Sequence, residues 1–278
     1  MRARSMALAI ILALCISVVQ AGEVAQAEDV GKSHSTLERI VKDKRLRVGV
    51  VLLAPLAMLN KNNELIGLEV DVARRLAADL GVSLELVRTN MPKIIDGLTA
   101  DRYDLVISGC SVTVPRALRV EFTAPYYHTA IRLVASKQAA PGKDLNYFNS
   151  PGVILGVISG HSEVAVAEKQ FPKASLRFFE NEDELLAALL AGKIPAAVVS
   201  DQLIRFNVAF HANKLYLPGG ENLATEAVAI AVRKNDHETL HFLNSWLEIL
   251  DSEGWIKARR AFWYEQSAWI KDIPGEFP

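Results

Sequence analysis

The stretch YDLVISGCSVTVPR, residues 103–116, decides how the rest of the sequence is interpreted. Its apolar run over residues 103–107 predicts a buried parallel strand, and the small polar residues after it predict a turn into a short helix. Thr113 can cap that helix, and Pro115 fits its first turn, where a missing N–H costs nothing. The free backbone N–H groups of such a turn suit an anion, and Arg116 adds a planar set of donors that matches a carboxylate. Taken alone, the stretch fits a carboxylate site and an ordinary strand–helix connection equally well.

Predicted strands and helices alternate on both sides of this stretch, which indicates parallel sheets. One helix carries its apolar residues at helical spacing and stops at Gly81, as a glycine cap predicts. We expect strands at 45–53, 82–88, 103–107, 152–158, 176–179 and 195–199, and helices at 36–42, 67–80, 94–100, 160–170, 183–191 and 236–250.

Two segments of the chain, 94–104 and 185–195, echo each other. Each reads as a helix followed closely by a buried strand whose carboxyl end turns polar. This repetition indicates an α/β fold of two lobes with similar connections. Each lobe is expected to hold a mostly parallel sheet with helices on both faces.

The C-terminal part is predicted to return to the first lobe. Residues 227–232 alternate as a strand and residues 255–269 are rich in aromatic side chains, and neither segment can bury itself alone. We therefore expect one lobe to comprise residues 37–135 and 223–278, and the other to comprise residues 137–222. The chain then crosses between the lobes twice, near 130–137 and 222–228, and two crossing strands act as a hinge.

The N-terminus is predicted to be a signal peptide. Arg2 and Arg4 precede an apolar run over residues 7–19, which is too short to span a bilayer comfortably. The A-x-A pattern at 25–27 predicts cleavage after Ala27, with Ala21 as the alternative. These features predict a protein exported to the periplasm.

Composition excludes several classes of partner. The 278 residues are 50% apolar and 23% charged, and the formal net charge is −1. That balance gives no electrostatic reason for binding nucleic acid or an anionic membrane surface. Removal of the predicted signal would leave Cys110 as the only cysteine, so no internal disulfide is expected.

Polar residues follow the predicted strands of both lobes. In open α/β sheets, ligands bind outside the carboxyl ends of the strands. This rule places Gly109, Ser111 and Arg116 on one wall of a cleft, and Ser162 and Asp201 on the other. An arginine facing an aspartate suits a zwitterion, although an isolated aspartate is more often a helix cap.

Seven short pieces of the sequence occur in an order and spacing that is typical of one family. They are LRVGV at 46–50, GLEVD at 67–71, DLV at 104–106, TVPR at 113–116, FTAPY at 122–126, GHS at 160–162 and Asp201. Over residues 37–263 the chain resembles the periplasmic solute-binding proteins of the polar amino-acid type (family 3), which deliver ligand to ABC importers.

The resemblance implies a small-molecule ligand, an amino acid or related carboxylate, and an ABC-importer permease as partner. It implies that Arg116 holds the ligand α-carboxylate, helped by the backbone N–H groups of Ser111 and Ser162. It further implies that Asp201, the Gly109 carbonyl and the Ser111 hydroxyl take the α-ammonium. A monomer without a catalytic residue, cofactor or metal is expected.

Several positions depart from the family pattern. Members commonly place aromatic residues near Leu53 and at Met91 to sandwich the ligand side chain, whereas this chain has aliphatic residues at both. Val51 stands where binders of polar ligands often carry an acid, and Pro195 replaces a usual aspartate at a strand start. Leu53 and Met91 are therefore expected to line an apolar side-chain pocket.

One alternative is a zinc protease, because residues 237–241 read H-E-x-x-H. Such an enzyme needs both histidines on one buried helix face, together with a third ligand. The polar run at 234–236 places His237 in an exposed first turn, and Glu265 could serve only nominally as a distant third ligand. The motif is interpreted as a chance match.

Another alternative is a cyclohexadienyl dehydratase on the same fold. Those enzymes share the arginine but add carboxylates in the cleft, because a general acid or base must reach the reacting proton. Leu53, Ala54 and Ile204 offer no acid where such enzymes have one, so dehydration is disfavoured but stays open. A sensor ectodomain is disfavoured because no membrane anchor is expected before Pro278.

Overall fold

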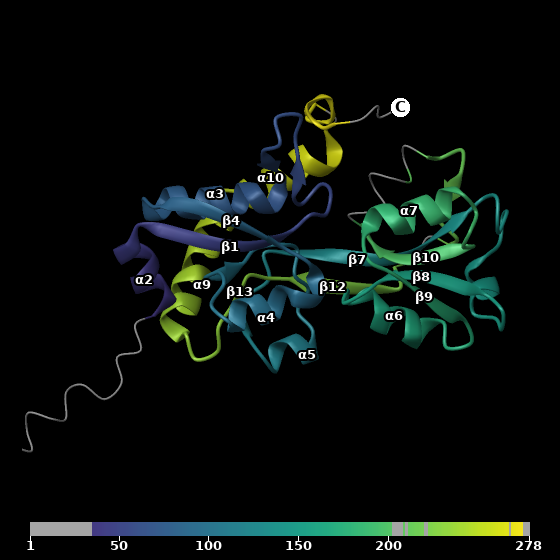
Figure 1. The fold of residues 1–278 in the computed structure, drawn as a ribbon, viewed down its shortest axis with the longest axis horizontal. Helices are drawn as coiled ribbons and strands as arrows, with labels where there is room; N and C mark the ends of the chain where they lie inside the picture. Colours follow the sequence, from purple (N-terminus) through teal and green to yellow (C-terminus); the bar gives the residue numbers. More distant parts are fainter. Residues whose placement is uncertain (1–34, 202–207, 209–210, 220–221, 267, 275–278) are drawn as a thin grey trace, which may run out of the picture. The chain divides into compact units, whose positions relative to one another are not determined.

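Two mixed β-sheets organise the part of the chain that the structure describes (Figure 1). This computed structural model describes residues 35–201, 208, 211–219, 222–266 and 268–274. The predicted signal peptide, its cleavage sites and Ile204 lie outside the described residues. Among the described residues, no helix is long and apolar enough to cross a membrane.

The first sheet has the strand order β4-β1-β5-β13-β6. Strand β1 pairs in parallel with both β4 and β5, whereas β13 is antiparallel to both β5 and β6. A short hairpin, β2–β3, stands beside this sheet as a separate pair. The strands are β1 (Arg45–Val51), β2 (Met58–Leu59), β3 (Leu65–Ile66), β4 (Ser83–Thr89), β5 (Leu105–Val106), β6 (Glu121–Phe122) and β13 (Ala231–Val232).

Helices cover both faces of the first sheet, because its strands carry apolar side chains on both sides. The α3 and α9 side chains share a core with Val48 and Val50, and the α4 side chains share another with Val106. Helix α3 ends at Gly81, which adopts the left-handed conformation (φ 64°) that the sequence predicted. The helices are α2 (Thr36–Asp43), α3 (Leu68–Leu80), η1 (Met91–Lys93), α4 (Ile94–Thr99), α5 (Val114–Ala117), α9 (His237–Ser252), α10 (Trp255–Glu265) and η3 (Ile270–Asp272).

A buried ion-pair network ties the first sheet to its helices. Asp104, whose side chain is 3% exposed, accepts hydrogen bonds from Arg39 Nη2 (2.6 Å) and Arg47 Nη2 (2.7 Å). Asp101 contacts the same two arginines and also Arg233, 3.0 Å away. The hydrogen bond from Arg39, opposed by burial, leaves the pKa of Asp101 below its usual range. The network therefore joins α2, β1 and the residue that follows β13.

The second sheet has the strand order β11-β7-β10-β8-β9, with β12 paired to β7. All five residues of β10 are buried, since its alternate side chains enter the cores beneath α6 and α7. Figure 1 shows these two helices on opposite faces of the sheet. The elements are β7 (Tyr127–Ser136), η2 (Leu145–Phe148), β8 (Ile154–Ile158), α6 (Glu163–Gln170), β9 (Ser175–Phe179), α7 (Glu182–Leu190), β10 (Ala196–Ser200), β11 (Leu215–Tyr216) and β12 (Ala224–Val228).

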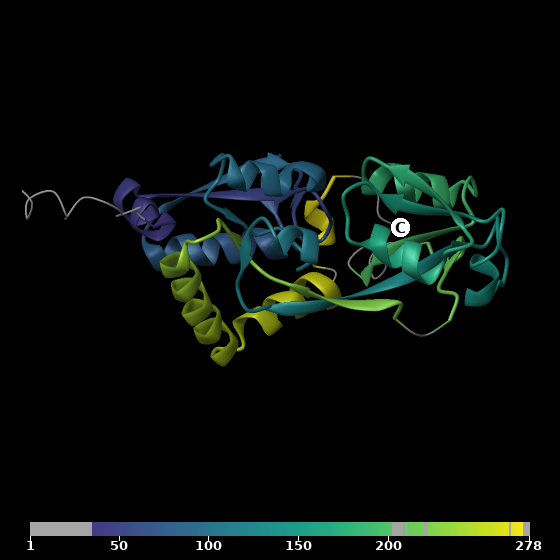
Figure 2. The same ribbon diagram turned by 90° about the horizontal axis from the view of Figure 1, so that it is seen from below.

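The two chain connections between the sheets are hydrogen-bonded to each other. Strand β12 pairs antiparallel with the first half of β7, from Ala224 opposite Ile131 to Val228 opposite Tyr127. Figures 1 and 2 show the two strands running side by side. The connections thus form one ribbon.

Two expectations about the strands need correction. The sheets were expected to be mostly parallel, but parallel pairing is confined to three strands of each sheet, because the crossing and returning strands add antiparallel pairs. The strand expected at 227–232 is two strands, 224–228 in the second sheet and 231–232 in the first. The chain changes sheet between them, and both segments are apolar, so the hydrophobic pattern does not mark the break.

Candidate functional site

Arg116 lies in α5 and is held by carbonyl groups that follow strands of both sheets. Its Nη1 donates to the Ser111 carbonyl (2.8 Å) and its Nη2 donates to the Gly160 carbonyl (3.1 Å). Thr113 stands at the N-cap position, but its side chain makes no capping hydrogen bond. Helix α5 is only four residues long, so its dipole is small, and the guanidinium supplies most of the positive charge at this position.

A cavity of about 900 Å³ brings three of the predicted site residues together. Met91, Arg116 and Ser162 line it, from η1, α5 and the N-terminus of α6 respectively. Glu226 of β12 lines the same cavity. A volume of this size is sufficient for a small organic ligand.

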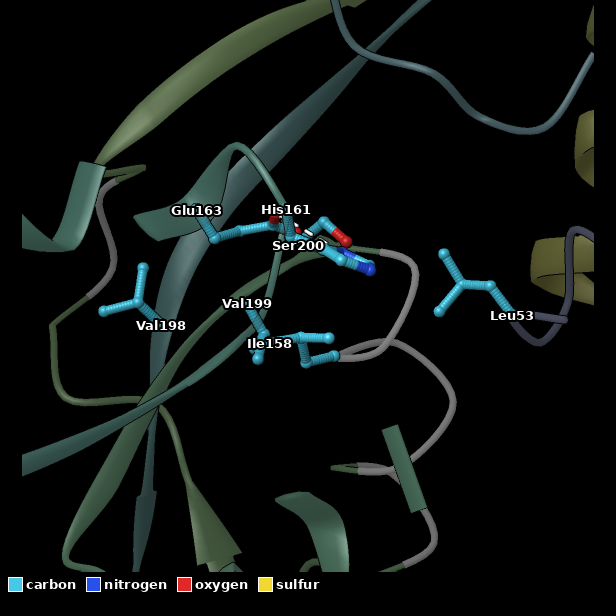
Figure 3. Close-up of a pocket in the computed structure, with 7 residues that line it drawn as sticks. All are labelled: Leu53, Ile158, His161, Glu163, Val198, Val199 and Ser200. Carbon is cyan, nitrogen blue, oxygen red and sulfur yellow. Dashed lines mark ion pairs between the residues drawn. The ribbon is translucent and has the colours of Figure 1, made fainter. Parts of the chain in front are cut away.

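Leu53 lines a second, much smaller cavity of about 10 Å³, which has room for about one water molecule. Figure 3 shows Leu53 on one side of it, facing His161, Ser200 and the other lining residues of the second sheet. His161 lines both cavities, so the two are neighbours. Leu53 and Met91 are both buried, at 8% and 7% exposure, but they line different cavities, so the shared apolar pocket expected for them stays a prediction.

Gly109 and Ser111 belong to a turn that is fixed by its backbone. Gly109 has φ +62°, and a Cβ there would lie 2.4 Å from Leu56 Cδ1, so only glycine fits without strain. Ser111 forms a bridge with Val228, and the Val112 N–H donates to the Ala227 carbonyl (2.9 Å). Neither Gly109 nor Ser111 is among the residues that line the two cavities.

Asp201 directly follows β10 and lies near a cation of the ribbon. Its Oδ1 is 3.7 Å from Nε of Arg132 in β7, and the two side chains are 18% and 29% exposed. Asp201 is likewise not among the lining residues of either cavity. The predicted pairing of Asp201 with a ligand ammonium therefore stays a prediction.

The sequence reasoning missed the partner of Ser162. The Ser162 hydroxyl donates to Glu226 Oε2 across 2.6 Å, and both side chains line the large cavity. The available signal was an acidic residue next to the apolar run at 227–232, but the strand was expected to begin after it. The cavity therefore holds a carboxylate as well as the Arg116 guanidinium.

A second missed carboxylate, Glu163, is buried beside the small cavity (Figure 3). Its Oε2 is 3.6 Å from His161 Nδ1. Burial alone would raise the pKa of Glu163, but the hydrogen bond and charge of His161, with a hydrogen bond from Ser200, leave it below its usual range. Glu163 is therefore ionised near neutral pH.

Glu182, at the start of α7, has the opposite protonation behaviour. Burial, reinforced by the charges of Asp183 and Glu163, raises its pKa to about 8, against the effect of a hydrogen bond from the Ala54 N–H. Its Oε1 is buried and has no hydrogen-bond partner among the described residues. The Glu182 carboxyl is thus protonated in the folded protein at neutral pH.

This protonation predicts a pH-dependent gain from Glu182→Gln. The folded-state pKa of about 8 lies above the ordinary glutamate value of about 4.3, so folding stability falls as pH rises between these two values. The neutral glutamine removes that loss, and its melting temperature should exceed that of the parent increasingly from pH 5 to pH 8. Thermal unfolding across this range measures the difference, with the exposed Glu180→Gln as control. Parallel curves for parent and Glu182→Gln would contradict the expectation.

The H-E-x-x-H segment lies in the first turns of α9. His237 is the first residue of this helix, and its side chain is 78% exposed, which confirms the predicted exposed position. Within the described ranges, no group of three or more histidine, cysteine or acidic side chains is arranged to hold a metal ion.

The chain is similar to amino-acid-binding proteins and to an enzyme. It is 26% identical over 234 residues to an L-arginine-binding protein of Pseudomonas aeruginosa, covering 80% of this chain and 88% of that relative. It is 24% identical over 236 residues to a cyclohexadienyl dehydratase of the same organism, covering 84% of this chain and 87% of the enzyme.

Solved structures show the same fold. An ancestral amino acid-binding protein, a precursor of cyclohexadienyl dehydratase, matches with a TM-score of 0.77 and 30% identity over 83% of this chain and 100% of its own. A putative ABC-transporter binding component from Wolinella succinogenes, complexed with lysine, matches with a TM-score of 0.75 and 30% identity over 82% and 99%.

These likenesses confirm the predicted two-lobed α/β fold of the periplasmic binding proteins. The sequence matches a family described as bacterial extracellular solute-binding proteins, family 3, over residues 46–266. Because this match covers most of the 278 residues, the chain belongs to that family.

Proposed function

We propose that this protein captures an amino acid or a related small carboxylate in the periplasm and delivers it to an ABC-importer permease. The observation that supports this most directly is Arg116, whose guanidinium lines a cavity of about 900 Å³ together with groups from the other sheet. Arginine binds carboxylates through two parallel hydrogen bonds, which fixes the orientation of the ligand. Amino-acid binding by relatives supports the choice of ligand class.

The remaining roles complete a zwitterion site. Arg116 takes the α-carboxylate, with help from the N–H groups of Ser111 and Ser162. Asp201, the Gly109 carbonyl and the Ser111 hydroxyl take the α-ammonium, and Leu53 and Met91 contact the ligand side chain. The lobes are residues 37–135 with 223–278, and residues 137–222.

A thermal-shift screen tests this function. The purified protein is heated with each of the twenty L-amino acids, starting with L-arginine and L-lysine, and with prephenate and arogenate. A ligand at a hundred times its dissociation constant stabilises the native state by about 2.7 kcal/mol, which is readily measured. If none of these compounds raises the melting temperature at millimolar concentration, the proposed ligand class is wrong.

The paired connections predict closure of the lobes around the ligand. The hinge was expected at residues 130–137 and 222–228, but residues 131–136 pair with β10 and β11 inside the second sheet. We therefore expect bending in the ribbon, near residues 127–130 and 224–230, because the described chain crosses between the sheets there. Small-angle scattering should give a smaller radius of gyration with saturating ligand than without it. A radius that does not change on saturation would argue against the hinge.

Dehydration of a cyclohexadienyl substrate is the second candidate function, and Glu163 is the observation that favours it. The sequence offered no acid near Leu53, yet this buried carboxyl lines the same small cavity as Leu53. Its lowered pKa leaves it ionised, which suits a base better than an acid. If the parent converts prephenate or arogenate and Glu163→Gln does not, the protein is a dehydratase. If the parent converts neither compound, this second candidate function is wrong.

A further inference from the structure

A buried carboxylate lies directly behind the turn that carries Gly109 and Ser111. Glu69, the second residue of α3, is 0% exposed. Its Oε2 accepts a hydrogen bond from the Tyr126 hydroxyl (2.5 Å), and its Oε1 accepts one from the Tyr127 hydroxyl (2.8 Å). The Tyr127 hydroxyl also lies beside Gly109, because a Cβ at Gly109 would be 3.5 Å from the hydroxyl oxygen. Both tyrosine donors lie outside α3, so the Glu69 carboxyl joins segments that are distant in the sequence.

Tyr127 links Glu69 to the segments that are expected to contact the ligand. Gly109 begins residues 109–112, here called the site loop, which bridges to Val228 of β12. Tyr127 is the first residue of β7 and pairs with the same Val228. Glu69 therefore fixes the site loop against the point where both strands of the ribbon begin to cross between the sheets.

The charged and titratable groups that act on Glu69 include Arg260, Tyr126 and Tyr127. Arg260 of α10 stacks on the Tyr127 ring at 4.7 Å and is the cation whose charge acts on Glu69. Burial raises the pKa of Glu69 above its usual range, although the hydrogen bonds from the two tyrosines oppose that rise. Burial and the Glu69 charge keep the pKa values of Tyr126 and Tyr127 well above the usual range, so both hydroxyls remain donors.

A buried carboxylate is an expensive way to stabilise a core. Apolar side chains of similar volume often replace buried charged groups with no loss of stability. The Glu69 carboxyl, however, accepts one tyrosine hydroxyl on each of its oxygens, which a glutamine cannot do because its amide nitrogen only donates. The hydrogen bonds at this position therefore require a side chain that accepts on both of its terminal atoms.

We propose that Glu69 is a positioning residue, which holds the site loop in its ligand-binding conformation and couples that loop to the start of the ribbon. This role rests on the proposed function, since it assumes that the site loop binds ligand. Glu69 itself need not touch the ligand. Its loss should therefore loosen Gly109 in the free protein and weaken binding as well.

Amide exchange measured by NMR on glycine-labelled protein tests the first part without any ligand. In Glu69→Gln, we expect the Gly109 amide to exchange about ten-fold faster, because the Tyr127 hydroxyl that lies beside Gly109 loses its acceptor. Tyr127→Phe keeps the carboxylate and removes one donor, so it should show a smaller increase. Tyr103→Phe is the matched control, because it removes another buried hydroxyl bond, to the Ile94 carbonyl at 2.5 Å.

Calorimetry with L-arginine and L-lysine tests the second part. Glu69→Gln should weaken binding by about ten- to hundred-fold, whereas Tyr103→Phe should bind as the parent does. Unchanged Gly109 exchange in Glu69→Gln overturns the proposal, and so does faster exchange with unchanged affinity. If Glu69→Gln does not fold, Tyr127→Phe carries both measurements with the same criteria. If the parent binds neither amino acid, calorimetry uses the compound with the largest thermal shift. A parent that binds none of the screened compounds contradicts the proposed function instead, and Gly109 exchange then decides the positioning role alone.

Discussion

Arg116→Ala is expected to weaken amino-acid binding by roughly thirty-fold to several thousand-fold. Removing one partner of a desolvated, hydrogen-bonded charge pair costs about 2–5 kcal/mol, because the ligand carboxylate is left buried and unpaired. At about 1.4 kcal/mol for each factor of ten, this cost gives the stated range. Calorimetry with the amino acid that produces the largest thermal shift measures it.

Three variants sharpen this expectation. Arg119→Ala is the control, because Arg119 lines the same cavity but is half exposed and paired with Asp96. Arg116→Lys should also bind poorly, since an ammonium cannot reproduce the planar pair of hydrogen bonds. Asp201→Asn should weaken an amino acid and leave its 2-oxo analogue almost unaffected, because only the amino acid carries an ammonium. An Arg116→Ala variant that binds as tightly as the parent would show that the carboxylate site is misplaced.

Asp104→Ala should strongly destabilise the first sheet and its helices. The Asp104 side chain is 3% exposed and neutralises Arg39 and Arg47, both within 2.7 Å. Removing one partner from a buried ion pair costs about 3–5 kcal/mol. In a protein of this size that corresponds to a melting temperature lower by about 6–20 °C.

Asp96 is a control that separates the effect of burial on ion-pair strength from the effect of distance. Asp96 also lies 2.6 Å from an arginine, Arg119, but these side chains are 53% and 52% exposed. Exposed pairs contribute about 0–1 kcal/mol, so Asp96→Ala should melt within a few degrees of the parent. Equal losses from Asp104→Ala and Asp96→Ala would mean that burial does not set the strength of the network.

The fold could be predicted from the sequence because its signals are local. Glycine at the end of α3, apolar periodicity in α9 and the strand–turn–helix at 103–116 each depend on a few consecutive residues. The sheet change between β12 and β13 could not be predicted in this way. It depends on which strands lie alongside, and Val228 and Ala231 are equally apolar and equally buried.

The site was predictable only where a family pattern or a strand end marked it. Arg116, Met91 and Ser162 were expected in the cleft, and the structure places all three along one cavity. Glu226 was missed because its partner Ser162 is 64 residues away, and no spacing rule links them. Glu69 was quoted only as part of the GLEVD piece, since its two tyrosine donors are 57 and 58 residues away in the sequence.

The position of β13 sets the order in which the chain can complete its structure during synthesis. This strand lies between β5 and β6, so the first sheet stays open until residue 232 has emerged. The second sheet draws all its strands from residues 127–228, an uninterrupted stretch that is complete earlier. Strands β5 and β6 must therefore wait, each with the edge that pairs with β13 still open, while later residues finish their own sheet. That interval is when β5 and β6 are most exposed to aggregation.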